Sequence, residues 1–442
     1  MSLLALAVLA IALVAITPFI VAAIDRSDIA SFVHLNMVQA GLYATAAAIV
    51  LFSRPKDRVW LIAVLLLVAI LIRLMAMQAP PNLTTDAYRY VWDGRLILEG
   101  INPYLYVPAD PQLSYLRDDV IYPNINKKDV ANTIYPPVAQ FLFALGAYIS
   151  PTILGQKIVM FICDLMVIGC LLAWLHHEGL PLTRIILYAW HPLPIWEFSS
   201  QAHIDAAIAA LMAAAIVSAA YKRQAITGAI IAAGFMVKYY PALLVPALWR
   251  HWDWRLPTAF IVTCLICYAP FITEAGSRVV GFLGNHLGNE GYRDGWGFHV
   301  IWLLRDVGFL PIRDDAFARS VTTAYLIASA LILMGLALKA YFVRPQHAIK
   351  AIDIALLAAA FVWLTSPHYP WYAGFLVIFL VRTPHPALFV MTIGAILLQY
   401  PRLPGGLSWT HLYFVAYWLP LILWVLPLLW RRCSGLSNKP SV

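Results

Sequence analysis

The chain has 442 residues, of which 62% are hydrophobic and only 12% are charged. Soluble domains carry roughly 45–50% apolar and about 25% charged residues, so this composition excludes a soluble protein and indicates an integral membrane protein. The formal net charge of +8 is dispersed among loops between apolar runs. That dispersion excludes a nucleic-acid-binding surface, which needs a concentrated basic patch.

Apolar runs long enough to cross a bilayer, about 20 residues each, follow one another along the chain. The first two occupy residues 3–23 and 35–53. The run at 138–150 is too short to span, so we expect a re-entrant or interfacial helix there, and Pro241 should break a later run into two short helices. The sequence predicts an all-α polytopic protein with about 13–14 transmembrane helices, forming a single membrane domain over residues 1–442.

Basic residues predict the orientation of these helices, because they gather in short cytoplasmic loops. Placing the basic loops inside, beginning with Arg54, Lys56 and Arg58, puts both termini in the cytoplasm. The opposite face then carries two large outer loops, at residues 78–136 and 275–317.

The first outer loop opens with a helical stripe of charges. Asp86, Arg89 and Asp93 are spaced i, i+3 and i+7, so they share one face of a helix. Asp86 closely follows the third predicted span, which places it at the outer membrane surface, where a lipid headgroup and a hydroxyl group in the aqueous phase can meet. The alternative interpretation is an interfacial amphipathic helix with solvated charges.

Further polar residues interrupt apolar runs downstream. Asp164 lies in the middle of one run and is either functional or a structural partner of a basic side chain. Glu197 flanks a predicted outer turn. Three further residues are predicted at the outer ends of their helices, level with Asp86: His203, Asp205 and Lys238.

Two other outer segments contain candidate ligand-binding residues. Residues 285–299 combine glycines with aromatic and cationic side chains, as a carbohydrate or phosphate site would, although glycine-rich turns are also common without a ligand. Residues 366–372 place His368 beside Trp371 between two prolines. We interpret both segments as candidate parts of a site.

Metal and cofactor motifs are missing from the sequence. It contains no H-E-x-x-H motif, P-loop or dinucleotide fingerprint. Its five cysteines lie in apolar runs, and the Cys264 and Cys267 pair has no neighbouring ligand, so packing explains it best. We expect neither a metal nor a cofactor.

The order of the polar motifs resembles that of a known enzyme family. Along the chain they read D-A-Y-R-Y-V-W-D-G-R, G-I-N-P-Y, Y-P-P, W-H-P-L-P-I-W-E, H-I-D-A, V-K-Y-Y-P-A-L-L-V-P and S-P-H-Y-P-W-Y. This set, over about residues 60 to 400, resembles the bacterial polyprenol-phosphate-mannose-dependent mannosyltransferases of the glycosyltransferase-C superfamily. The resemblance implies a glycosyltransferase-C-type fold and a catalytic acidic residue in the first outer loop, and Asp86 matches that position. The family's G-N-x-H-N-D is here S-Q-A-H-I-D, which leaves the sugar and the acceptor open.

The resemblance and the polar residues together predict an inverting glycosyltransferase of the bacterial inner membrane, with its active site on the periplasmic side. It would transfer a hexose, with mannose expected, from a polyprenyl-phosphate-sugar donor to a lipid-linked or glycan acceptor among membrane lipids, with Asp86 as the base. Donor phosphate and sugar candidates are Lys238, Arg89, His368, His299, Arg293, His203, Asp205 and Tyr239. Candidates for stacking on sugars are Trp92, Tyr104, Trp296 and Trp371.

Two other functions remain open at this level. A polysaccharide ligase or polymerase would share the substrate class but favour a site built on arginine and histidine. A lipid or solute transporter would place paired ionisable groups at the bilayer midplane and show repeated halves. The polar residues of this chain concentrate near one predicted surface, which disfavours the transporter.

Overall fold

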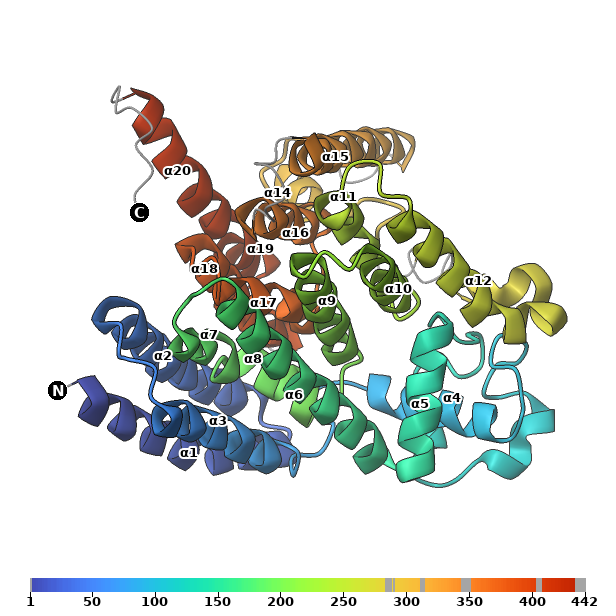
Figure 1. Cartoon of the computed structure of the whole chain (residues 1–442). Coiled ribbons are helices and arrows are strands. Elements are labelled where there is room, and N and C mark those ends of the chain that lie inside the picture. Colours follow the sequence, from blue (N-terminus) through green and yellow to red (C-terminus); the bar gives the residue numbers. More distant parts are fainter. Residues whose placement is uncertain are drawn as a thin grey trace.

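A computed structural model describes residues 2–282, 288, 291–310, 315–342, 351–402 and 408–433, and every regular element in those ranges is helical (Figure 1). Seven helical segments there are long and apolar enough to cross a bilayer. They are α1 (Ser2–Asp25), α2 (Ile29–Ser53), α3 (Val59–Ala76), α6 (Ile153–His177), α12 (Arg255–Ala275), α15 (Asp315–Phe342) and the segment Trp409–Pro427. Six shorter apolar helices accompany them. The prediction of an all-α polytopic membrane protein is confirmed.

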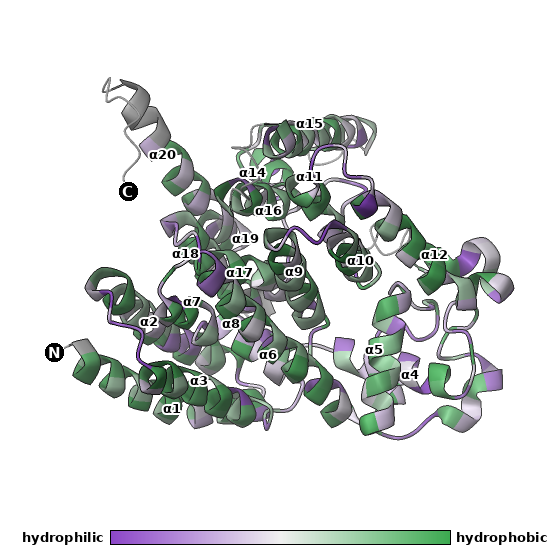
Figure 2. Cartoon of the chain, viewed as in Figure 1, coloured by the Kyte–Doolittle hydropathy of each residue, from purple (hydrophilic) through white to green (hydrophobic). Residues whose placement is uncertain are grey.

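Helices α1, α2 and α3 pack together at the N-terminal end. Their inner faces are buried, as at Leu13 and Ile20, whereas Ile11 and Phe19 are about two-thirds exposed. Apolar side chains that point outward in this way suit contact with lipid tails, because the tails are equally apolar. Figure 2 shows hydrophobic residues along these helices and hydrophilic ones around α4 and the loops beside it.

An enclosed ion pair joins α3 to α6. Arg73 Nε lies 2.7 Å from Asp164 Oδ2, and both side chains are fully buried. Asp164 also accepts hydrogen bonds from Tyr188 Oη at 2.6 Å and Ser199 Oγ at 3.3 Å. Since every one of these partners comes from the protein, Asp164 has the structural role that was one of its two predicted interpretations.

The first predicted outer loop contains α4 (Asp86–Leu98), two short 3-10 helices, η1 (Pro111–Leu116) and η2 (Tyr122–Asn124), and then leads into α5 (Pro137–Ile149). Helix α4 packs closely on α5 at Gly94, where a Cβ atom would lie 2.2 Å from the Phe143 carbonyl oxygen. Only glycine allows this approach. The D-G-R motif therefore fixes how α4 sits against α5, whose short length agrees with the prediction.

The chain breaks near Pro241 as predicted, between α10 (Gln224–Phe235) and the 3-10 helix η5 (Tyr240–Leu244). The Met236 carbonyl just after α10 accepts from the backbone N–H groups of Val138 and Ala139 in α5. These bonds satisfy two amides at the start of α5, where a helix has no internal partners. They also hold the residues after α10 against the first outer loop.

The remaining elements complete the bundle around α9 (Asp205–Ala220). They are η3 (Leu182–Ile185), α7 (Ile186–Ala189), α8 (Pro192–Pro194), the π-helix η4 (Ile195–Ser200), α11 (Val245–Leu248), η6 (Gly276–Val280), α14 (His299–Asp306), α16 (Ala351–Thr365), η7 (Pro370–Leu376), α17 (Val377–Leu380), α18 (Pro386–Gly394), η8 (Ala395–Arg402), α19 (Trp409–Tyr413), the π-helix η9 (Phe414–Trp418) and α20 (Leu419–Cys433).

Parts of two predicted regions lie outside the described residues. In the second outer loop these are 283–287, 289–290 and 311–314, and in a basic loop assigned to the cytoplasm they are 343–350. The start of α1 lies on the left of Figure 1, and α4 and α5 lie on the right. The orientation of the chain across the membrane stays a prediction.

Candidate active site

A cavity of about 1450 Å³ opens beside the start of α4. Its walls come from segments far apart in the sequence: the start of α4, residues 124–136, residues 238–240, the turn at 291–298 and residues 361–375. Aromatic side chains and charged groups line it together. We take it as the candidate active site.

Asp86 is the first residue of α4 and lines this cavity. Its backbone N–H donates to Thr84 Oγ1 at 3.2 Å, and its carboxyl side chain is 24% exposed. One turn further along, Arg89 also lines the cavity, donating to Asp93 Oδ1 at 2.7 Å and to the Ala131 carbonyl at 2.9 Å. The predicted polar stripe is thus helical, and the buried Asp93 orients Arg89.

Lys238 reaches the cavity from the break after α10. Its Nζ atom lies 2.6 Å from Asp205 Oδ2 and 4.5 Å from the centre of the Tyr372 ring. Asp205 heads α9, is fully buried, and also accepts from Tyr240 Oη at 2.9 Å. The protein itself thus supplies the anionic partner that a half-buried lysine requires.

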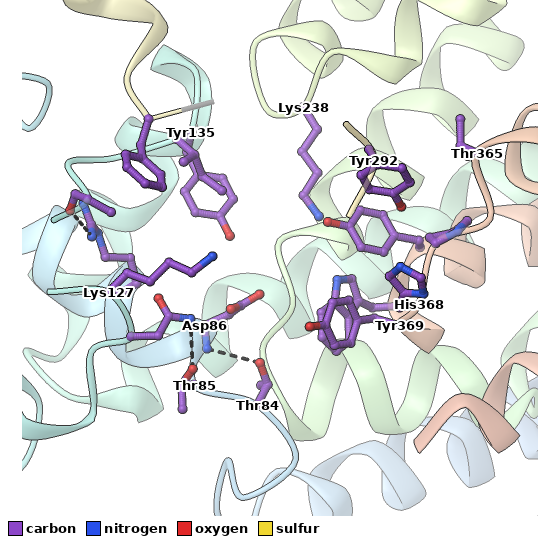
Figure 3. A pocket seen from close by; sticks show the side chains of 18 of the residues that line it. Thr84, Thr85, Asp86, Lys127, Tyr135, Lys238, Tyr292, Thr365, His368 and Tyr369 are labelled. Atoms are coloured by element: carbon purple, nitrogen blue, oxygen red, sulfur yellow. Dashed lines mark hydrogen bonds between the residues drawn. The ribbon is translucent and has the colours of Figure 1, made fainter. Parts of the chain in front are cut away.

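His368 stands on the same side of the cavity as Lys238. Its Nδ1 atom lies 2.7 Å from Tyr413 Oη, and its ring faces Tyr292 at 6.0 Å. Figure 3 shows Asp86 facing Lys238, Tyr292 and His368 across the cavity. Three further predicted residues also line it, namely Tyr239, Arg293 and Trp371.

Six predicted site residues do not line the cavity: His203 and Asp205, described below, and four others. His299 is fully buried, with Nε2 3.0 Å from the Trp363 carbonyl, and burial lowers its pKa to about 3. It is therefore neutral at pH 7 and does not fit the expected cationic role. Trp92 and Tyr104 are buried in apolar clusters, and Trp296 packs on Arg305 at 3.9 Å. None of these three fits the expected stacking on a sugar in this cavity.

The segment between η4 and α9 connects both sides of the site. Gln201 accepts from the Leu83 N–H at 3.1 Å and donates to the Pro80 carbonyl at 3.3 Å, which holds the residues that lead into α4. His203 is buried with its ring stacked on Trp371 at 3.9 Å, and its Nδ1 atom lies 3.9 Å from Asp86 Oδ2. His203 and Asp205 therefore stand behind the cavity wall.

The structure adds lining residues that the sequence reasoning missed. Lys127 and Asn126 come from the first outer loop, where Asn126 donates to Thr85 Oγ1 at 3.0 Å. The polar and basic run N-I-N-K-K in that loop is the sequence feature that could have indicated these two residues. Tyr135, in the Y-P-P motif, also lines the cavity, and burial raises its pKa well above the ordinary value, so its hydroxyl remains a donor.

The described residues contain no group of three side chains placed to hold a metal ion. Comparison with known proteins gives a family. The model of glycosyltransferase family 87 matches residues 133–367, more than half of the chain, while searches of curated proteins and of solved structures found no match. The matched range includes Lys238, His203 and Arg293 and begins after Asp86. The chain therefore belongs to glycosyltransferase family 87 and is a membrane glycosyltransferase.

Proposed function

We propose that the protein transfers a hexose, with mannose as the expected sugar, from a polyprenyl-phosphate-sugar donor to a lipid-linked or glycan acceptor. The reaction would invert the anomeric centre, with Asp86 as the base, on the periplasmic face of a bacterial inner membrane. The observation that carries the proposal is the placement of a carboxylate and several cationic or imidazole groups on facing walls of one cavity.

Lys238 and His368 stand on one side of the cavity, which Arg293 also lines, and these groups suit the phosphate of the donor. As the bond between the sugar and phosphate breaks, negative charge grows on the phosphate oxygens, and fixed cations stabilise it. The Lys238 ammonium has three donors, of which one is directed to Asp205. A phosphate would share the remaining donor capacity with the Tyr372 ring face.

Asp86 suits the other half of the reaction. Its carboxylate would take the proton from the acceptor hydroxyl while that oxygen bonds to the anomeric carbon and the bond to phosphate breaks. Polyprenyl phosphate leaves with the bonding electrons. A carboxylate is a weak base for an alcohol, so the proton must move as the leaving group departs. This single displacement, with the reactants held in line, turns a β-linked donor into an α-linked product.

The cavity is large enough for two sizeable substrates. Its volume of about 1450 Å³ exceeds the roughly 300–1,000 Å³ of usual small-molecule pockets. Leu326 of α15, Phe361 of α16 and Phe375 of η7 line one part of it and would accommodate a prenyl chain. Trp371, stacked on Tyr369 at 4.5 Å, offers an aromatic surface for a sugar. The matched family is an enzyme family, which sets the transporter alternative aside.

The test is transfer by the purified protein in detergent. Radiolabelled polyprenyl-phosphate mannose is supplied with a bacterial lipid extract as acceptor, and products are identified by mass spectrometry. Nucleotide-activated mannose and polyprenyl-phosphate glucose serve as matched donors. We expect transfer from polyprenyl-phosphate mannose and none from nucleotide-activated mannose. Transfer from the nucleotide sugar would overturn the donor assignment. A preference for glucose would revise the sugar.

The Asp86→Asn variant tests the base in the same assay. Asparagine keeps the shape of the side chain but cannot accept the proton, so transfer should fall by about 10²-fold or more while thermal stability is retained. A fully active variant would remove Asp86 as the base and favour the arginine- and histidine-based site of a ligase or polymerase.

A further inference from the structure

His203 lies buried between two carboxylates. Its Nε2 atom is 3.3 Å from Glu197 Oε2, its Nδ1 atom is 3.9 Å from Asp86 Oδ2, and the ring has no solvent exposure. Glu197 comes from the π-helix η4 and Asp86 from the start of α4. Glu197 and His203 come from η4 and the turn that follows it, and Asp86 comes from the distant start of α4, so two segments of the chain place three ionisable groups in one row that ends at the cavity.

The inner end of this row is enclosed. The Glu197 side chain is only 3% exposed, and its Oε1 atom lies 3.5 Å from Gln399 Nε2. Neither ring nitrogen of His203 nor Glu197 Oε2 has a well-formed hydrogen bond within the described residues. Burying a carboxylate without a positive or donating partner is costly, and for Glu197 the nearby ionisable partner in the described residues is His203.

The chemistry of imidazole limits how these groups pair. A neutral imidazole donates from one nitrogen, whereas an imidazolium donates from both. Both His203 nitrogens face a carboxylate, so the imidazolium is the form that suits Glu197 and Asp86 together. Trp371 of η7 covers the ring with an uncharged face. Asp205, two residues further along, is directed to Lys238.

We propose that Glu197, His203 and Asp86 act as a unit in which His203 is a positioning residue for the base. Resting on the proposed function, this inference moves His203 from donor binding to the support of Asp86. Held by Glu197, the imidazolium orients Asp86 Oδ2 and stabilises the ionised carboxylate, which leaves Oδ1 to accept the proton from the acceptor hydroxyl. The proton stays on Asp86 until the product leaves.

The 3.9 Å between His203 Nδ1 and Asp86 Oδ2 exceeds a hydrogen bond. Such contacts are often long without substrate and shorten in the reactive complex. A movement of Asp86 toward His203 when the acceptor binds would complete the row.

The kinetic test compares His203→Gln and Glu197→Gln with the wild type, using polyprenyl-phosphate mannose and the lipid extract. We expect kcat to fall about tenfold or more in both, with the donor KM unchanged. In His203→Gln the acid side of the kcat profile should move to higher pH, because the Asp86 carboxylate then lacks a cation beside it. A raised donor KM at unchanged kcat would return His203 to donor binding and overturn the proposal.

A matched control separates this role from packing. His191 is equally buried, with Nε2 3.0 Å from Thr392 Oγ1 and its ring 4.8 Å from that of Tyr43, and no ion pair with a carboxylate is found for it in the described residues. The His191→Gln variant should lose stability without a change in the pH profile. If His203→Gln behaves in the same way, His203 is only a packing residue and the proposal fails.

A second measurement does not depend on transfer. Nitrogen-15 NMR of histidine-labelled protein in detergent reports imidazolium directly, and the His203 signal is identified by its loss in His203→Gln. We expect this signal to be imidazolium at pH 7 in the wild type and to lose that character in Glu197→Gln. A neutral His203 in the wild type would overturn the proposal that the three residues act as a unit. If His203 is imidazolium but the protein transfers no sugar, the result counts against the proposed function instead.

Discussion

Two of the ion pairs that involve buried aspartates, Arg73 with Asp164 and Lys238 with Asp205, differ in what surrounds them. The pair of Arg73 and Asp164 is fully enclosed between α3 and α6. Arg73 also donates to the Ala189 carbonyl, and Asp164 also accepts from Tyr188 Oη. The pair of Lys238 and Asp205 is just as short, yet the lysine side chain is 16% exposed and lines the cavity. The first pair therefore serves the packing of helices, and we propose that the second presents a charge to a ligand.

This difference also applies to the carboxylates of α4. Asp86 is partly exposed to the cavity, whereas Asp93 is fully buried and binds Arg89. A buried ion pair marks the groups that hold the fold, as Asp93 holds Arg89. Access to the cavity marks those that we expect to touch a substrate.

The largest effect is expected at the enclosed pair. Arg73→Met leaves the Asp164 carboxylate buried without its cation, which should lower the free energy of unfolding by about 3–5 kcal/mol. Thermal unfolding in detergent measures the loss, and transfer per folded molecule should equal that of the wild type. Restored stability in the double variant Arg73→Met with Asp164→Leu would confirm that the damage comes from the unpaired charge.

The cavity pair should behave differently. Lys238→Met should reduce kcat/KM for polyprenyl-phosphate mannose about 100-fold, which is about 2.7 kcal/mol, because the donor phosphate loses its cation. The variant also leaves Asp205 unpaired, so Lys238→Met with Asp205→Asn is the control. We expect this double variant to recover stability but not donor use. Recovery of both would make the pair structural, like that of Arg73 and Asp164.

The smallest effect is expected at Asp93. Asp93→Asn weakens the hold on Arg89 but leaves the bond from Arg89 to the Ala131 carbonyl. Transfer should fall about tenfold, less than the 10²-fold expected from loss of a general base, as measured in the same assay beside Asp86→Asn. Equal losses in the two variants would indicate a site that uses both carboxylates and would end the distinction between them.

Much of the fold was predictable because its causes are local. The spacing of Asp86, Arg89 and Asp93 predicts the polar face of α4. Pro241, which lacks a backbone donor, predicts the break in the later apolar run, and it stands at the start of η5 after α10 has ended at Phe235. The length of an apolar run decides whether it spans a bilayer, which explains why the short α5 was also anticipated. These features depend on neighbours within a few residues.

Part of the site was not predictable, because burial depends on the whole fold. His299 and Trp92 are residue types that suit phosphate and sugar binding, yet both lie among aromatic or apolar neighbours away from the cavity. Lys127 was not among the predicted site residues but lines the cavity. Composition and spacing do not distinguish these outcomes.

The sequence by itself determined a helical membrane protein, since hydropathy and periodicity act through short-range physics, and it predicted that the polar chemistry lies near one end of the spans. Only the tertiary structure decided which polar residues meet. Glu197 and His203, from η4 and the turn after it, meet Asp86 at the start of α4, and Lys238 forms an ion pair with Asp205 of the protein itself. The packing of segments far apart in the chain brings Asp86 to His203 and Lys238 to Asp205, and such contacts leave no local signal in one sequence.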